Sequence, residues 1–236
     1  MSDWKPKRFW QAATAQPCDG GFTVTLDGRA VKTPAKALLV VPTMPMAEAI
    51  ALEWDAQTGL VDPRTMPVTR SANAAIDKVR SQRAEVIALL AEYGDSDLLC
   101  YRAATPDGLV AKQAQHWDPL LDWAARELDA PLAVGQGVMH VTQPPESLAT
   151  LQRALEAFDD FALAAAHDLI SLSGSLVLAL AVTRQYLLAA QAWDISRVDE
   201  DWQIAQWGLD EEAAAATAVK RDAFLHAERV FHLSRA

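Results

Sequence analysis

The sequence predicts an α+β fold, with a small N-terminal domain of antiparallel strands and a helix packed on a larger all-α C-terminal domain. Residues 22–26 alternate apolar and polar side chains with the period of two that is typical of a half-buried strand. Beyond residue 75, in contrast, nearly every segment has helical periodicity or is rich in strong helix formers. We therefore predict an N-terminal α+β domain at residues 1–75 and an α-helical C-terminal domain at residues 76–236.

Turn signals divide the N-terminal domain into short strands. Asp27-Gly28 directly follows the first predicted strand, and this dipeptide supplies the positive φ angles of a tight hairpin turn. The return strand is predicted at residues 29–33, a further short strand at 38–41, and an earlier one around Trp10. Gly20-Gly21 precedes a strand and not a helix, so we interpret it as a turn and not as a phosphate-binding loop.

Helices follow these strands. Residues 45–58 have apolar side chains at intervals of three and four, and Thr69 or Ser71 is predicted to cap the next helix. Residues 98–102 and 132–134 are predicted to be short extended pieces. The other segments predicted to be helical are 82–93, 109–129, 144–157, 159–172, 174–190, 194–206 and 210–231.

Composition narrows the class of partner and the compartment. The formal charge of −10 argues against nucleic acid or an anionic membrane as the partner. The longest apolar stretch, residues 169–182, is too short for a membrane span of about 20 residues, so we predict a buried core helix and no membrane insertion. Residues 1–8 contain no apolar secretory segment, and Cys18 and Cys100 are too few for a disulfide framework. We predict a cytoplasmic protein.

The search for catalytic motifs is negative. None of GxSxG, GxxxxGK[ST], GxGxxG or HExxH occurs, and the five histidines are scattered along the chain. Cys100 has apolar neighbours that should raise its thiol pKa, so we interpret it as a packing residue. We therefore predict no catalytic residue, no cofactor and no metal, and that the chain is not an enzyme.

One pair of carboxylates offers an alternative. Asp118 and Asp122 lie four residues apart and share a helix face, where paired carboxylates could bind a metal in a hydrolase. Pro119, however, suits the first turn of a helix, which makes Asp118 its N-cap. We prefer the capping interpretation and keep the metal-dependent hydrolase as the alternative.

A second acidic region favours protein binding. Between residues 194 and 212 the chain has seven acids and only one base, Arg197. Helix N-termini explain part of this, because acids there complement the helix dipole. Trp202 and Trp207 lie among the acids, however, and aromatic anchors within a charged rim are typical of protein interfaces.

Several short motifs, in one order along nearly the whole chain, together resemble a known family. The chain is similar to the assembly chaperones of the F-type ATP synthase that act on its α subunit. The motifs that carry the resemblance are Arg8-Phe9-Trp10, Leu26-Asp27-Gly28-Arg29, Lys32-Thr33-Pro34-Ala35-Lys36, Glu53-Trp54-Asp55-Ala56-Gln57, Asp62-Pro63-Arg64-Thr65-Met66-Pro67, Asp97-Leu98-Leu99-Cys100-Tyr101-Arg102, Trp117-Asp118-Pro119-Leu120-Leu121, Ser173-Gly174-Ser175 and the segment from Asp199-Glu200 to Trp207-Gly208.

The resemblance implies a function and a binding site. It implies that the chain binds the unassembled α subunit and shields its interface from aggregation, with no ATP hydrolysis of its own. It implies α-subunit contact at Glu200, supported by Asp199, Trp202, Gln203, Trp207 and Glu211, while Trp54 bridges its helix to the N-terminal sheet. We expect a monomeric bacterial member in the cytoplasm, for which the mitochondrial matrix is the equivalent compartment in eukaryotic relatives. A scaffold or adaptor protein is the remaining alternative.

Overall fold

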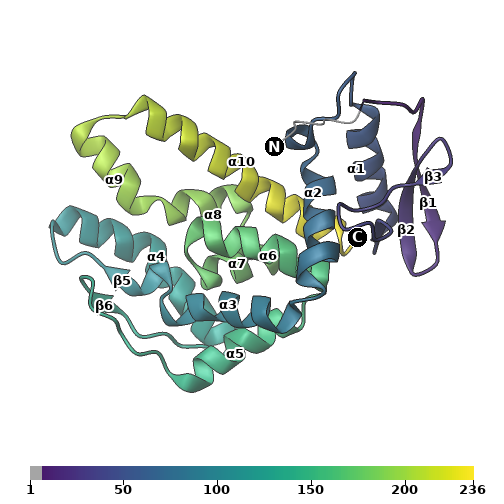
Figure 1. The fold of residues 1–236 in the computed structure, drawn as a ribbon. Helices are drawn as coiled ribbons and strands as arrows, with labels where there is room; N and C mark the ends of the chain where they lie inside the picture. The colour runs from purple at the N-terminus through teal and green to yellow at the C-terminus, as the bar shows by residue number, and fades with distance from the viewer. Residues whose placement is uncertain (1–6) are drawn as a thin grey trace. The chain divides into compact units, whose positions relative to one another are not determined.

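The computed structural model describes residues 7–236, so most of the segment that argued against a secretory signal, residues 1–6, lies outside the described residues. The chain divides into two compact units. The first comprises residues 1–83, 159–165 and 229–236, and the second comprises residues 84–158 and 166–228. The α+β prediction is confirmed: the antiparallel strands lie near the N-terminus, and helices make up most of the rest (Figure 1).

The elements are as follows. The strands are β1 (Ala13–Cys18), β2 (Gly21–Leu26), β3 (Arg29–Ala30), β4 (Val40–Val41), β5 (Tyr101–Arg102) and β6 (Gly135–Gln136). The α-helices are α1 (Met44–Asp55), α2 (Pro67–Ala74), α3 (Arg83–Asp95), α4 (Asp107–Glu127), α5 (Pro145–Glu156), α6 (Asp160–Ser173), α7 (Leu176–Thr183), α8 (Ala189–Ser196), α9 (Val198–Trp207) and α10 (Glu211–Leu233). The 3₁₀ and π turns are η1 (Pro63–Thr65), η2 (Ala75–Val79) and η3 (Leu98–Cys100).

An antiparallel sheet forms the N-terminal part of the first unit. β2 pairs with β1 from Ala13↔Leu26 to Cys18↔Gly21, with β3 on its other side and with β4 at its start. Asp27 and Gly28 have φ angles of 47° and 83°, which confirms the predicted hairpin turn. The early strand predicted around Trp10 is wrong, because the first strand begins only at Ala13.

The predicted return strand at 29–33 is too long, because β3 ends at Ala30. The Thr33 hydroxyl donates to the Asp77 carboxylate at 2.6 Å, and the Thr33 amide donates to the Ala37 carbonyl at 2.9 Å. These bonds turn the chain out of the strand. The motif Lys32-Thr33-Pro34-Ala35-Lys36 therefore forms the turn that ends this strand.

Helix α1 covers the sheet and carries a motif that joins three parts of the first unit. Glu53 accepts hydrogen bonds from the Val68 and Thr69 amides, at 2.7 and 2.8 Å, and so caps α2. The predicted cap at Thr69 or Ser71 is therefore wrong, since both residues lie inside α2. The Trp54 ring meets the Trp10 ring edge to face, with centroids 5.2 Å apart. This contact joins α1 to the segment before β1, whereas the role predicted for Trp54 was a bridge to the sheet itself.

Two later segments complete the first unit. The Asp160 carboxylate at the start of α6 accepts hydrogen bonds from Arg80 and Arg83, at 3.2 and 3.1 Å. The Thr43 hydroxyl donates to the Leu233 carbonyl near the end of α10. Nothing in the local sequence pattern indicated that these segments join the first unit.

The apolar run at residues 169–182 lies in the second unit and is mostly buried. The run does not form one helix: α6 ends at Ser173 and Gly174 has a φ of +73°, so the break lies where the helices predicted at 159–172 and 174–190 meet. Ser175 then caps α7, accepting from the Leu178 amide at 3.0 Å. The helix predicted at 174–190 is also interrupted after Thr183, where Gln185 has a φ of +59°.

The buried Asp97 carboxylate connects this helix start to the segment that follows α3. It accepts from the Ser175 hydroxyl at 2.7 Å, from the Leu99 amide at 3.0 Å and from the Val177 amide at 3.0 Å. The Leu98 amide donates to the Gly174 carbonyl. Two motifs that lie about 78 residues apart in sequence therefore form one structure.

The predicted extended pieces are only partly correct. Leu98–Cys100 is a 3₁₀ turn, while Tyr101–Arg102 forms β5, which pairs in parallel with β6 just beyond the piece predicted at 132–134. No helix within residues 7–236 is both long and apolar enough to cross a membrane.

Candidate functional site

The six residues predicted to bind a partner lie on α9 and at the start of α10, within the second unit. Asp199, Glu200 and Asp201 occupy the first turn of α9, where acidic side chains complement the helix dipole. Asp210 caps α10, accepting from the Ala213 amide at 2.9 Å. Part of the acidic character therefore stabilises helix starts, as predicted from the sequence.

Two of the six residues pack against α4. The Asp199 carboxylate accepts from the Gln113 side-chain amide at 2.6 Å. The Trp202 ring lies over Gly108, so closely that a Cβ atom at Gly108 would be 2.7 Å from the ring. Trp202 therefore points inward, and these two side chains position α9.

Three others lie on the outer face of α9. Glu200, Gln203 and Trp207 are spaced i, i+3 and i+7, so they share one face of the helix. Ile204, at i+4, lies on the same face and was not predicted. The Trp207 side chain is 80% exposed and that of Ile204 40% exposed. We call these four residues the α9 stripe.

The α9 stripe combines apolar area with one carboxylate. Glu200 forms an ion pair with Arg197 at 2.7 Å, and its side chain remains 43% exposed. Arg197 in turn lies 5.8 Å from the centre of the Trp193 ring. Because the Glu200 side chain remains accessible, a cation on a partner can reach it and pair with it in place of Arg197.

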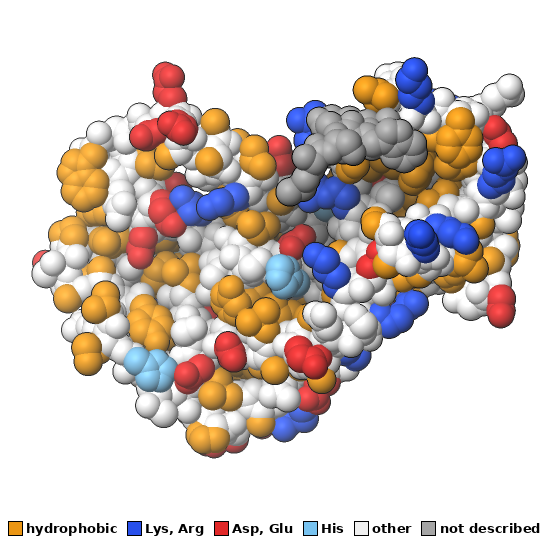
Figure 2. Space-filling view, viewed as in Figure 1, with side chains coloured by type: hydrophobic (Ala, Val, Ile, Leu, Met, Phe, Trp, Pro, Cys, Tyr) orange, Lys and Arg blue, Asp and Glu red, His pale blue; other side chains and the backbone are white. Residues whose placement is uncertain are grey.

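The surface around the stripe has the same mixed character. Glu211, the sixth predicted residue, is exposed in the first turn of α10, and Leu209 between the helices is 62% exposed. Figure 2 shows apolar and acidic side chains side by side over α9 and the start of α10. Such a surface suits an amphipathic protein partner better than a small polar substrate.

Gln113 links α4 to the start of α9. Its side chain is 1% exposed, accepts from the Ala103 amide at 2.8 Å and donates to Asp199. We expect Gln113→Leu to lower the free energy of unfolding by about 1–3 kcal/mol, because it leaves a buried amide and a carboxylate without partners. Urea denaturation measures this, with exposed Gln206→Leu as the control. Equal stability losses in both variants would contradict this role.

The alternative site at Asp118 and Asp122 receives a different explanation. Asp118 forms an ion pair with the buried Arg102 at 2.8 Å, and that guanidinium also lies 5.2 Å from the centre of the Trp117 ring. A cation at Asp118 would have to compete with this fixed positive charge. Among residues 7–236, no group of three histidine, cysteine, aspartate or glutamate side chains is arranged to hold a metal.

The capping interpretation of Asp118 is wrong as well. Pro119 lies in the middle of α4, which begins at Asp107, so Asp118 is an interior helix residue. Its ion pair with Arg102 explains its position better. Cys100 is buried as predicted, and burial raises the pKa of its thiol to about 12, with a smaller contribution from Asp97.

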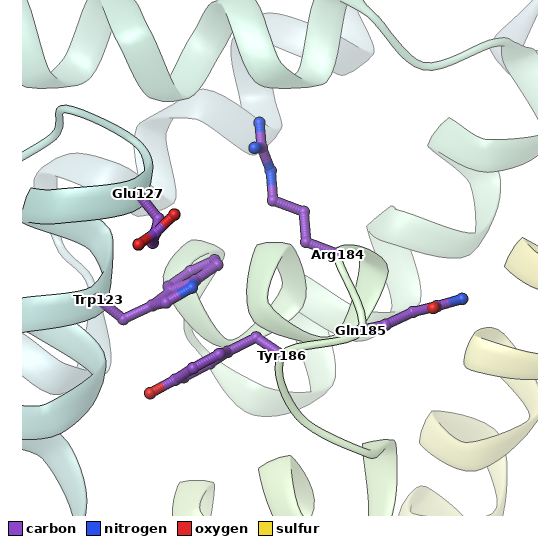
Figure 3. Close-up of a pocket in the computed structure, with 5 residues that line it drawn as sticks. All are labelled: Trp123, Glu127, Arg184, Gln185 and Tyr186. Carbon is purple, nitrogen blue, oxygen red and sulfur yellow. The ribbon is translucent and has the colours of Figure 1, made fainter.

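The second unit also contains a cavity of about 550 Å³ that the sequence did not predict. Trp123 and Tyr186 stack with centroids 5.0 Å apart, and Arg184 and Glu127 stand beside them, whereas Gln185 points away (Figure 3). The lining contains none of the six predicted residues. It includes one acidic and one basic side chain and holds no nucleophile paired with a base.

Comparison with known proteins agrees with a binding protein of this kind. A family model described as ATP12 chaperone protein matches residues 7–125. The mitochondrial protein atp12 of Schizosaccharomyces pombe is 26% identical, with 88% of this chain and 75% of that protein covered. A solved structure of Atp12 from Paracoccus denitrificans is 48% identical, with a TM-score of 0.95 and coverage of 97% of this chain and 98% of that one. The solved structure of a point mutant of that Paracoccus denitrificans protein is 47% identical, with the same TM-score and coverage.

The fold, the motifs and these comparisons identify the class of protein as an assembly chaperone. The chain belongs to the ATP12 chaperone family. The function predicted from its motifs, a chaperone for the assembly of ATP synthase, is therefore confirmed at the level of the family.

Proposed function

We propose that the chain binds the unassembled α subunit of the F-type ATP synthase through the α9 stripe, as a monomer that forms a one-to-one complex. The observation that supports this best is the exposure of Trp207, 80% of whose side chain is accessible, beside Ile204 and the carboxylate of Glu200. Exposed aromatic side chains among charged neighbours are frequent anchors of protein interfaces. The compartment proposed is the bacterial cytoplasm.

The stripe suits a temporary cover. An unassembled subunit exposes a large apolar patch where it will meet its neighbour, and such patches drive aggregation. Trp207 and Ile204 can cover part of that patch, while Glu200 exchanges Arg197 for a cation of the client. Because the apolar area is small and Arg197 remains beside Glu200 to pair with it again, the complex can dissociate when the proper neighbouring subunit arrives. This role requires no catalytic residue.

The experiment is co-expression with an isolated ATP synthase α subunit, followed by size-exclusion chromatography. We expect a soluble one-to-one complex with the unchanged chain. We expect Trp207→Ala to weaken it by about 30-fold, since truncating an interface anchor costs about 2 kcal/mol or more. Glu200→Lys should also weaken it, because lysine repels both Arg197 and the cation of the client.

The control is Glu92→Lys, which makes the same charge change on the exposed surface of α3 in the same unit. It should bind like the unchanged chain. If the complex formed with both α9 variants, the α subunit would still be the partner, but its binding site would lie outside the α9 stripe. No complex at all, with the α subunit aggregating as it does alone, would contradict the proposed partner. Stable co-purification with the finished enzyme would favour the scaffold alternative.

A further inference from the structure

A cavity of about 260 Å³ opens in the first unit, between the N-terminal segment and the edge of the sheet. It is lined by Phe9, Trp10, Leu26, residues 29–32, Trp54 and Val61, and we call it the Trp10 cavity. Most of these side chains are apolar. Since a cavity of roughly 150 Å³ already takes up benzene, this one has room for a large apolar side chain.

Two donors in the walls of this cavity have no acceptor. The indole nitrogens of Trp10 and Trp54 are both buried, and within residues 7–236 neither has a hydrogen-bond partner. Trp10 as a whole is only 4% exposed. Buried indole N–H groups normally find an acceptor. Both rings line the cavity, so an occupant would change the surroundings of these two indole groups.

The rim of the cavity adds positive charge. Arg29 and Lys32 line it and are exposed, and neither forms an ion pair among the described contacts. The Asp27 carboxylate is near Arg29 but is occupied by the amides of Gln11 and Ala12. Phe9, 66% exposed, provides an apolar lip.

The first unit has a small excess of basic residues, like the rim of the cavity, whereas the second unit is strongly acidic. The first contains 13 basic and 10 acidic residues, whereas the second contains 8 basic and 21 acidic residues. A ligand of the first unit should therefore be acidic, unlike the client expected at the α9 stripe, which supplies a cation to Glu200.

We propose that the Trp10 cavity is a docking site for an acidic–apolar segment of a partner protein. One large apolar side chain of that segment enters the cavity. This side chain packs against the rings of Trp10 and Trp54, and flanking carboxylates pair with Arg29 and Lys32. This site is independent of the α9 stripe and of the partner that binds there.

The test uses the full-length chain and short peptides. The probe is acetyl-Glu-Asp-Leu-Asp-Glu-amide, and the comparison peptides replace its leucine with glycine or its four acids with lysine and arginine. Nuclear magnetic resonance follows the eight tryptophan indole N–H signals, which Trp10→Phe and Trp54→Phe assign. We expect the acidic leucine peptide to shift these two signals in a saturable manner, and both comparison peptides to bind at least tenfold more weakly.

Charge variants test the rim. Arg29→Glu with Lys32→Glu should weaken binding of the acidic peptide by roughly tenfold or more, because it reverses both rim charges. Lys36→Glu with Arg70→Glu makes the same charge change at exposed residues of the first unit outside the cavity, and should change the affinity less than threefold. Thermal unfolding checks that each variant is folded.

Three results would overturn the proposal: no shift of the two indole signals, equal binding of the basic peptide, or equal weakening by both charge variants. No α subunit is present in this assay. A negative result would therefore leave the α9 proposal standing, and failure to bind the α subunit would leave the docking site standing.

Discussion

Replacing Asp97 with alanine is expected to lower the free energy of unfolding by about 3–5 kcal/mol, the largest loss that we predict for a single substitution. Asp97 is fully buried and accepts hydrogen bonds from the Leu99 amide, the Ser175 hydroxyl and the Val177 amide. Alanine would leave these donors without acceptors in the interior. It would also remove a carboxylate from the start of α7, where negative charge is favourable.

Urea denaturation followed by circular dichroism measures this loss. The control is Glu92→Ala, which removes a carboxylate from the exposed surface of α3 a few residues earlier. It should change stability by less than about 0.5 kcal/mol. If the two variants lost similar stability, the hydrogen bonds of Asp97 would not be the cause.

The contribution of Asp97 to stability should also depend on pH, and its direction follows from the pKa of the residue. Burial raises the pKa of Asp97 from 3.8 to about 6, and the hydrogen bonds from Val177, Ser175 and Leu99 oppose this rise. Between these two values the folded state binds more protons than the unfolded state. The stability contributed by Asp97 is therefore fully present below pH 3.8 and is lost as the pH rises through about 6.

Asp97→Asn removes this titration and provides the reference. We expect the stability of the unchanged chain relative to Asp97→Asn to fall by about 1.4 kcal/mol from pH 5 to pH 7.5. Denaturation curves of both proteins at several pH values measure the difference. A relative stability that instead rises with pH would show that the three donors and the helix start outweigh burial and lower the pKa.

The sequence predicted those parts of the fold that depend on local signals. The Asp27-Gly28 turn and the helices from α3 to α6 follow from residue types and periodicity. Strand β1 was missed because it lies at the edge of the sheet, with Pro17 in it and no buried residue, so it lacks a clear apolar alternation. The break between α6 and α7 lies where the segments predicted at 159–172 and 174–190 meet, whereas the end of α7 after Thr183 was missed because helix-forming residues continue beyond it.

The contacts between motifs could not be predicted, since they depend on tertiary structure. The pairing of Asp97 with Ser175 and the capping of α2 by Glu53 join residues that are distant in sequence. In the binding site, the orientation of Trp202 toward Gly108 depends on the packing of α9 against α4. Ile204 could have been found, because its i+4 spacing from Glu200 places it on the stripe.

Replacing Glu53 with alanine is expected to lower the free energy of unfolding by about 2–4 kcal/mol. The Glu53 carboxylate accepts from the Val68 amide at 2.7 Å and from both the amide and the hydroxyl of Thr69, at 2.8 and 2.7 Å. Hydrogen bonds to a charged group contribute about 1.5–3 kcal/mol each, and a carboxylate at a helix start gains further from the helix dipole. Thermal and urea denaturation measure the loss.

Two variants separate the possible causes of this effect. Glu48→Ala removes an exposed carboxylate from the same helix and should change stability by less than about 0.5 kcal/mol. Glu53→Gln retains one acceptor but turns an NH₂ group toward a donor, so its loss should lie between those of the other two variants. If Glu53→Gln were as stable as the unchanged chain, the charge and the second acceptor would be unnecessary, and Glu53 would serve mainly to fill space between α1 and α2.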